Sequence, residues 1–317
     1  MTIHHHHPYM TIHDFKSHSH YSWDHALKPI AEVDSGQTIT YEITDASGGQ
    51  FTKNSTAADV MKLDFNKINP VAGPIYIKGA QPGDTLEIEM IDFRQLEWGW
   101  TALVPGLGLL ADDFKEPAFK TFDLTKRNRF EFLDGIDLFL KPFPGTVGVA
   151  LPEPGSHSIL PPRKNGGNMD IRHLIRGTKL YLPVWVEGAL FSIGDTHAAQ
   201  GDGEVCGTAV EASIETTVRF KLHKGKTIQG PRYEIPGPPT PEADSNGYYV
   251  TTGHGEDIYQ ASQHAIRYMI EHLVDTYKMS EQEAYMLCSV AVDLRISEIV
   301  NTPNTLVSAF LPQAIFY

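Results

Sequence analysis

The chain has 317 residues, of which 41% are hydrophobic and 10% aromatic, so it can bury a sizeable core and is long enough for two domains. Its formal net charge of −13 disfavours nucleic acid and anionic membranes as partners and favours a neutral or cationic small molecule. No apolar run reaches the roughly 20 residues that cross a bilayer. Two cysteines and the lack of an apolar signal core predict a cytoplasmic protein without a disulfide framework.

The N-terminus contains a histidine run, His4 to His7. Such a quartet can chelate metal, but at a chain end it is more typical of a disordered tail or an expression tag. We therefore expect residues 1–19 to form a flexible tail. The next pair, His18 and His20, can also bind metal if the segment is extended, although a flexible entry segment is the simpler interpretation.

From about residue 29 to 233, short alternating segments are separated by Gly, Pro, Asn and Asp, which is typical of an all-β body. Two segments, 36–45 and 83–92, show this alternation clearly. Their predicted inward-facing residues are Ile39, Tyr41 and Ile43 in the first and Leu86, Ile88 and Met90 in the second. We predict an α+β, predominantly β fold with a sandwich or barrel-like body.

Helical patterns appear at 55–63 and, more strongly, at 258–277. Ser280 and Glu283 match a capping box, which predicts a further helix to about Ala291. The proline-rich segment 236–247 is expected to be a loop, a domain junction or a lid. The predicted organisation is an N-terminal β domain at 20–150 and a second β-rich domain at 151–317 that ends in a small helical region.

The segment SIGDTHAAQGDGEVCG at 192–207 concentrates polar groups between glycines. If 200–203 form a tight turn, residues 192–199 and 204–214 make an antiparallel hairpin. With a two-residue loop, His197 lies opposite Cys206, and both share a face with Asp195 and Glu204. An Asp-x-His pair on one face can hold a divalent ion, or it can act as a base with its orienting carboxylate.

Other residue types leave alternatives open. Cys206 can be a nucleophile activated by His197, but no known cysteine-protease signature surrounds it, and packing in the core is the simpler interpretation. Asp45 and Asp170 are also flanked by glycines, which let the backbone approach a ligand. The sequence does not show that these acids meet the 192–207 segment in space.

Taken together, these motifs resemble the acetamidase/formamidase family of amide hydrolases. The matching segments cover nearly the whole chain after about residue 20, and their order and spacing are more specific than any one of them. They are DASGGQ at 45–50, NPVAGPIYI at 69–77, VPGLGLL at 104–110, GGNMD at 166–170, YLPV at 181–184, GDTHAAQGDGEVCG at 194–207, EAY at 283–285 and DLRIS at 293–297.

The resemblance implies an amidase that hydrolyses formamide, acetamide or similar short-chain amides to the acid and ammonia. It also implies a divalent metal, zinc or calcium, and a homodimer or higher homo-oligomer. The expected site residues, all in matched segments, are Asp45, Asp195 and His197 for the metal, Glu204 and Asp170 for catalysis, and Gln50 and Asn168 for substrate binding.

Hydrolysis of an unactivated amide needs an activated water, a polarised carbonyl and a proton for the departing amine. A metal held by Asp195, His197 and a carboxylate would supply the first two, and Glu204 would move the proton. The alternatives are a hydrolase of another small C–N bond, a thiol amidase using Cys206, and a non-catalytic metal-binding β-sandwich module with a structural calcium.

Overall fold

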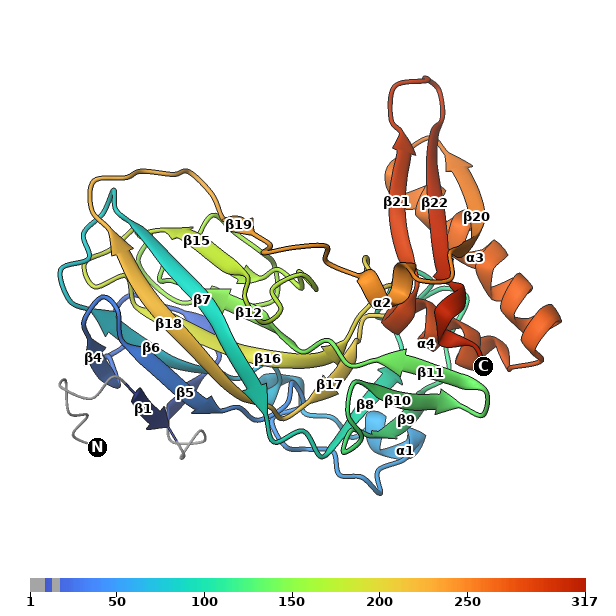
Figure 1. Cartoon of the computed structure of the whole chain (residues 1–317), viewed down its shortest axis with the longest axis horizontal. Helices are drawn as coiled ribbons and strands as arrows, with labels where there is room; N and C mark the ends of the chain where they lie inside the picture. The colour runs from blue at the N-terminus through green and yellow to red at the C-terminus, as the bar shows by residue number, and fades with distance from the viewer. Residues whose placement is uncertain (1–8, 13–17) are drawn as a thin grey trace.

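The computed structural model describes residues 9–12 and 18–317. Figure 1 shows a β-rich body at one end and a smaller unit of helices and strands, built by the C-terminal residues, at the other. The predicted α+β, predominantly β fold is confirmed. The histidine run His4 to His7 lies outside the described residues. Within the segment expected to be a tail, β1 (Tyr9–Ile12) pairs in parallel with β5 (Thr38–Glu42).

Two large open sheets make the body. The first has the strand order β1, β5, β18 (Glu215–His223), β7 (Thr85–Arg94), β15 (Lys179–Pro183) and β19 (Arg232–Glu234). The second has the order β14 (Gly166–Asn168), β12 (Phe143–Gly148), β16 (Phe191–Ala199), β17 (Val210–Ala212), β8 (Trp98–Leu103) and β9 (Ala118–Asp123). In this second sheet β6 (Val71–Ile77) pairs with β16, β2 (Ser19–His20) and β4 (Ala31–Val33).

The core of the body lies between these two sheets. Alternation places apolar side chains of β5 and β7 against those of β6, β12 and β16, in one continuous cluster. The six inward-facing residues predicted in 36–45 and 83–92 are at most 3% exposed. The alternation of apolar and polar residues in these segments therefore predicted correctly which side chains face the core.

The two sheets do not divide at residue 150. Each takes strands from both sides of that position, for example β5 and β18 in the first sheet and β8 and β16 in the second. Strands that are far apart in sequence pair with each other, so each sheet mixes residues of the predicted domains 20–150 and 151–317. Composition does not reveal such pairing. Smaller elements complete the body: β10 (Arg129–Leu133), β11 (Ile136–Phe139), β3 (Ser22–Trp23), β13 (His157–Ser158), α1 (Ala57–Val60) and the 3-10 turn η2 (Phe65–Lys67).

Both predicted C-terminal helices are present, as α3 (Ile258–Tyr277) and α4 (Glu281–Ala291). The Ser280 hydroxyl accepts from the Glu283 backbone N–H, as the capping box predicts. The region is more than helical, because α3 packs on an antiparallel sheet of β20 (Tyr248–Gly255), β22 (Thr305–Pro312) and β21 (Asp293–Glu298). The proline-rich junction includes the short helix α2 (Pro241–Asp244), and η3 (Gln313–Ile315) follows β22.

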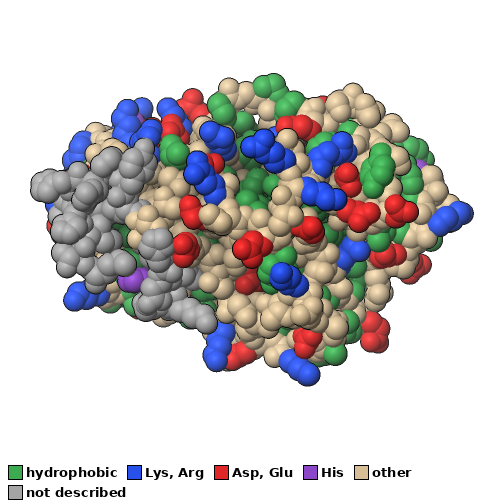
Figure 2. Space-filling view, turned by 60° about the horizontal axis from the view of Figure 1, so that its bottom comes forward, with side chains coloured by type: hydrophobic (Ala, Val, Ile, Leu, Met, Phe, Trp, Pro, Cys, Tyr) green, Lys and Arg blue, Asp and Glu red, His purple; other side chains and the backbone are tan. Residues whose placement is uncertain are grey.

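The surface carries charges of both signs. On the face in Figure 2, acidic and basic side chains are interspersed, so the excess of acids does not form one patch there. Among the described residues, no helix combines the length and apolarity that spanning a membrane would require.

Candidate active site

The segment at 192–207 does not form the predicted tight hairpin. β16 pairs with β17, and His197 lies opposite Glu211 rather than Cys206. The connection makes two successive turns, in which the Glu204 N–H donates to the Gly201 carbonyl and the Gly207 N–H donates to the Glu204 carbonyl. Glu204 has a positive φ of 44°, so it lies in this connection and not on a strand.

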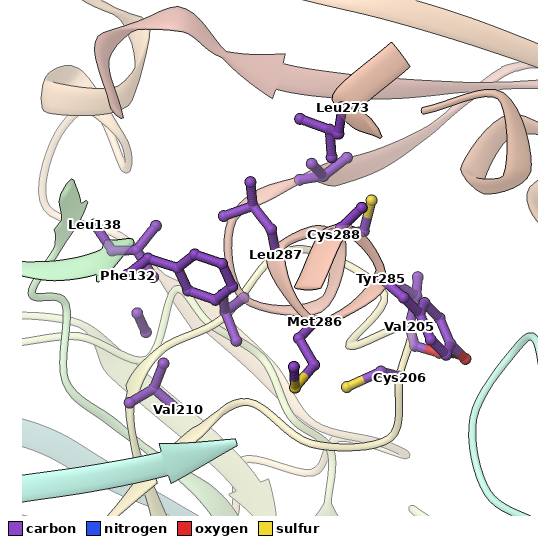
Figure 3. Close-up of a cluster of buried hydrophobic side chains, with 14 of the residues drawn as sticks. Phe132, Leu138, Val205, Cys206, Val210, Leu273, Tyr285, Met286, Leu287 and Cys288 are labelled. Carbon is purple, nitrogen blue, oxygen red and sulfur yellow. Dashed lines mark hydrogen bonds between the residues drawn. The ribbon is translucent and has the colours of Figure 1, made fainter. Parts of the chain in front are cut away.

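Cys206 is part of the hydrophobic core. Its side chain is buried, and its thiol donates to the backbone carbonyls of Ala102 and Thr208, both at 3.6 Å. Figure 3 shows it beside Met286 of α4, among apolar side chains. Burial also raises the pKa of this thiol, which opposes thiolate formation. These observations favour the packing role over the nucleophile.

One histidine and four acids converge at the centre of the second sheet. His197 Nε2 lies 3.0 Å from Asp195 Oδ1 and 2.9 Å from Glu211 Oε2. The same nitrogen lies 3.8 Å from Glu204 Oε2 and 4.0 Å from Asp170 Oδ1. We call these five residues the acid cluster. They come from β16, β17, the connection between them and the loop after β14.

Unusual backbone geometry holds this arrangement. Three of the four acids, Asp170, Asp195 and Glu204, have positive φ angles of 50°, 55° and 44°. Residues other than glycine rarely adopt a positive φ. Where several do so together, the strained backbone often marks a functional site. Gly145 of β12 permits the close approach, because a Cβ at that position would lie 2.6 Å from Asp170 Oδ1 and 2.7 Å from Asp195 Oδ2.

Gln200 fixes the orientation of the imidazole. Its side-chain amide donates to the Asp170 carbonyl at 2.8 Å, so its oxygen must accept, at 3.0 Å, from His197 Nδ1. Nδ1 therefore carries a proton. Nε2 is thus left facing carboxylate oxygens, and that contact is favourable only when a proton or a cation lies between them.

Burial and mutual repulsion perturb the pKa values of the cluster. Burial and the charge of Asp195 raise the pKa of Asp170 to about 7, and burial raises that of Glu211 to about 8. Burial and the charge of Asp170 raise the pKa of Glu204 well above its ordinary value. Burial alone would lower the pKa of His197, but the carboxylates of Glu211 and Asp195 outweigh it and raise that pKa well above normal.

The donor set of the cluster fits a divalent cation. Two groups, Asp170 with Asp195 and His197, and His197 with Glu204 and Glu211, each place their donor atoms within 4.8 Å of one another. Two buried carboxylate oxygens lack a well-placed hydrogen-bond donor. Asp170 Oδ1 lies 4.0 Å from His197 Nε2, and Glu211 Oε2, at 2.9 Å, competes for that nitrogen with Asp195 Oδ1. A nitrogen with several carboxylates is a ligand set that zinc accepts.

The structure does not bring Asp45 into this cluster. Its Oδ2 accepts hydrogen bonds from Ser47 and from Trp100 Nε1, and its Oδ1 accepts from the Gly49 N–H. These contacts use the carboxylate to hold a loop and an indole ring. The structure thus gives Asp45 a role in shaping the site wall.

Of the two expected substrate-binding residues, only Asn168 lines the pocket over the cluster. Its oxygen accepts from Thr146, and its nitrogen donates to the Leu160 carbonyl. Gln50 instead makes hydrogen bonds with the Ser47 carbonyl and with both backbone groups of Asp64. Gln50 therefore anchors a neighbouring loop.

Glu211 was missed in the sequence because the assumed loop length put the wrong residue opposite His197. A signal was nevertheless present, since Glu211 is the single charged residue in the largely apolar run AVEASI at 209–214. A carboxylate buried on such a strand needs a partner. Its partner is His197.

The acid cluster forms the floor of a pocket of about 150 Å³. Asp170, Asp195, Glu204 and Glu211 all line it, whereas His197 is fully buried behind them. The volume is below the roughly 300 Å³ at which drug-sized ligands begin to fit. A small substrate therefore suits this pocket.

In this mostly β fold, a histidine and four carboxylates lie under a small pocket, and this set of groups fits a hydrolytic enzyme. The model of the Acetamidase/Formamidase family matches residues 7–155 and 153–317, so the chain belongs to this family and is an amidase. The formamidase of Methylophilus methylotrophus is 28% identical over 94% of this chain and 89% of that protein.

Solved structures show the same architecture. The crystal structure of an acetamidase from Bacillus halodurans is 31% identical, with a TM-score of 0.67 over 96% of each chain. A gamma lactamase from Delftia acidovorans has a TM-score of 0.89 over 97% of this chain and 93% of that one. At 24% identity, this second likeness shows the fold alone.

Proposed function

We propose that the protein hydrolyses short-chain primary amides, such as formamide and acetamide, to the carboxylic acid and ammonia, with a divalent metal ion in the acid cluster. The observation that carries the proposal is the convergence of His197 Nε2 with four carboxylates on the floor of a small pocket. Family membership and the formamidase and acetamidase relatives support the reaction class.

Asp195, His197 and Glu211 would hold the metal, because the two carboxylates lie nearest to Nε2. When bound, the ion would polarise the amide carbonyl and acidify a water molecule. A histidine nitrogen among the ligands favours zinc over calcium, which prefers oxygen ligands throughout. The same nitrogen argues against a purely structural calcium module.

Glu204 and Asp170 remain for proton transfer. Both line the pocket, and both lie about one ångström farther from Nε2 than the two nearest carboxylates do. From this position Glu204 can take a proton from the attacking water and deliver it to the departing nitrogen. Asn168 uses one of its two N–H groups for Leu160, so the other is available to orient the substrate amide.

The test is ammonia release from formamide, acetamide and propionamide by protein whose metal content has been measured. We expect turnover that follows metal content and disappears after chelation. Turnover in protein without stoichiometric metal would remove the metal from the proposal, and no ammonia from any amide would overturn the reaction. Assembly into a homo-oligomer stays a prediction, for which sedimentation is the measurement.

A further inference from the structure

The mouth of the active-site pocket is apolar and exposed. Phe65, Leu107 and Leu160 line the pocket, and they are 54%, 48% and 55% exposed. We call these three residues the collar. Scattered exposed apolar residues need no explanation, but three that come from separate segments and meet at one opening indicate a binding surface.

The pocket is chemically divided along its depth. Its lining includes the four carboxylates of the acid cluster with Asn168 and Thr208, and also the apolar side chains of Trp100, Val104 and Ile68. The collar residues are about half exposed, whereas Trp100 and Val104 are buried, so the collar forms the solvent side of the pocket. The amide group of a substrate fits against the polar residues of the pocket. Formamide has no carbon chain that would contact the collar.

The collar is built on anchored backbone. Gln50 holds both backbone groups of Asp64, the residue that caps the turn carrying Phe65. The Leu160 carbonyl accepts from Asn168 of the pocket itself.

The Leu107 segment is fixed in the same way. The Leu107 N–H donates to the Val104 carbonyl, and two residues later the Leu109 N–H donates to the Val205 carbonyl. All three collar segments are therefore held in place before substrate arrives, which reduces the ordering cost of binding.

We propose that the collar binds the acyl chain, and that the preferred substrates are primary amides with a linear apolar chain longer than acetyl. This inference rests on the proposed amidase function. The reaction is unchanged: water oxygen bonds to the acyl carbon, the C–N bond breaks, the nitrogen takes the proton, and R–CO–NH₂ with H₂O gives R–COOH and NH₃. Each methylene group that reaches the collar raises kcat/KM by about fourfold, following apolar transfer energies.

The experiment measures kcat/KM for ammonia release across formamide, acetamide, propionamide, butyramide and pentanamide. The wild type is compared with Leu160→Ser and with Leu160→Ser combined with Phe65→Ser. Ile299→Ser is the matched control, because Ile299 is 56% exposed and is not among the residues that line the pocket. We expect kcat/KM to rise with chain length in the wild type and the control, and to rise less in the collar variants, mainly through KM.

A flat or falling series in the wild type, with ammonia still released, overturns the inference and leaves the amidase function standing. Calorimetric binding of the same amides to the Glu204→Gln protein separates the remaining cases. Tighter binding with chain length but no turnover in the wild type supports the collar and overturns the function. Collar variants that change the sedimentation mass but not the chain-length trend show an interface between copies, which also overturns the inference.

Discussion

Two groups of acids, one at Arg172 and one at His197, are stabilised in opposite ways. Arg172, two residues after Asp170, pairs with Asp293 at 2.6 Å and with Asp202 at 3.3 Å. In the acid cluster, four carboxylates share one imidazole. An acid that is buried with its own cation is part of the fold, whereas acids buried in excess of their cations need a ligand.

The largest effect should come from the acid cluster. Glu204→Gln removes the proton carrier without changing the size of the side chain, so kcat should fall by about 10² to 10⁴. Thermal unfolding should change little, because the residue lies in a connection and not on a strand. The measurement is ammonia release beside a melting curve, with Glu116→Gln on an exposed loop as control. Near-normal turnover in Glu204→Gln would rule out the proton-carrier role.

Arg172→Met should act on stability. It leaves Asp293 buried without its cation, and breaking such a pair costs about 3 to 5 kcal/mol. Urea unfolding of Arg172→Met and of the double variant Arg172→Met with Asp293→Leu checks this. The double variant should regain much of the loss, because no unpaired charge remains. If the double variant is as unstable as the single one, the ion pair is not what stabilises this region.

Gly145→Ala should damage the site through geometry alone. Its Cβ would push against the Asp170 and Asp195 carboxylates, and overpacking of this kind costs about 1 to 3 kcal/mol. We expect lower activity and weaker zinc binding, measured by competition with a chromogenic chelator. Gly230→Ala is the matched control, because a Cβ there meets nothing within 4 Å. Equal behaviour of the two variants would show that the close approach at Gly145 is unimportant.

The smallest effect concerns Asp84, an acid with a nearby cation. Burial alone would raise its pKa, but hydrogen bonds from the Gly225 and Gln81 N–H groups and from Lys224 outweigh burial and hold the pKa below its usual value. Its stabilisation is therefore present above the unfolded pKa of about 3.9 and is lost as pH falls through the folded value. Melting temperatures between pH 2.5 and 7 should show a smaller acid-induced loss in Asp84→Asn; identical curves would contradict this assignment.

Local signals were sufficient for much of the fold. The alternation around Ile39 and Leu86 identified buried faces, and Ser280 with Glu283 identified a helix start, because each depends only on neighbours in sequence. The C-terminal sheet was not predicted, since β20 pairs with β22 across α3 and α4. The mixing of both chain halves in each sheet escaped prediction for the same reason.

Less of the candidate site could be predicted from the sequence. Asp195, His197, Glu204 and Asp170 were named, but their assembly depends on left-handed backbone at three of them and on a gap at Gly145. Glu211 was missed because strand register depends on the length of the 200–209 connection, and the turns at Gly201 and Glu204 make it longer than the pattern suggested. The matched segment around Asp45 indicated a ligand where the structure shows a loop anchor.

The contrast between the two groups of acids is tested most directly by locating the metal. Crystals grown with zinc and measured at the zinc absorption edge should show one ion bound by His197 Nε2, Asp195 and Glu211, and no ion at Arg172. An ion bound elsewhere, or an acid cluster held together by protons alone while the protein hydrolyses amides, would contradict the account.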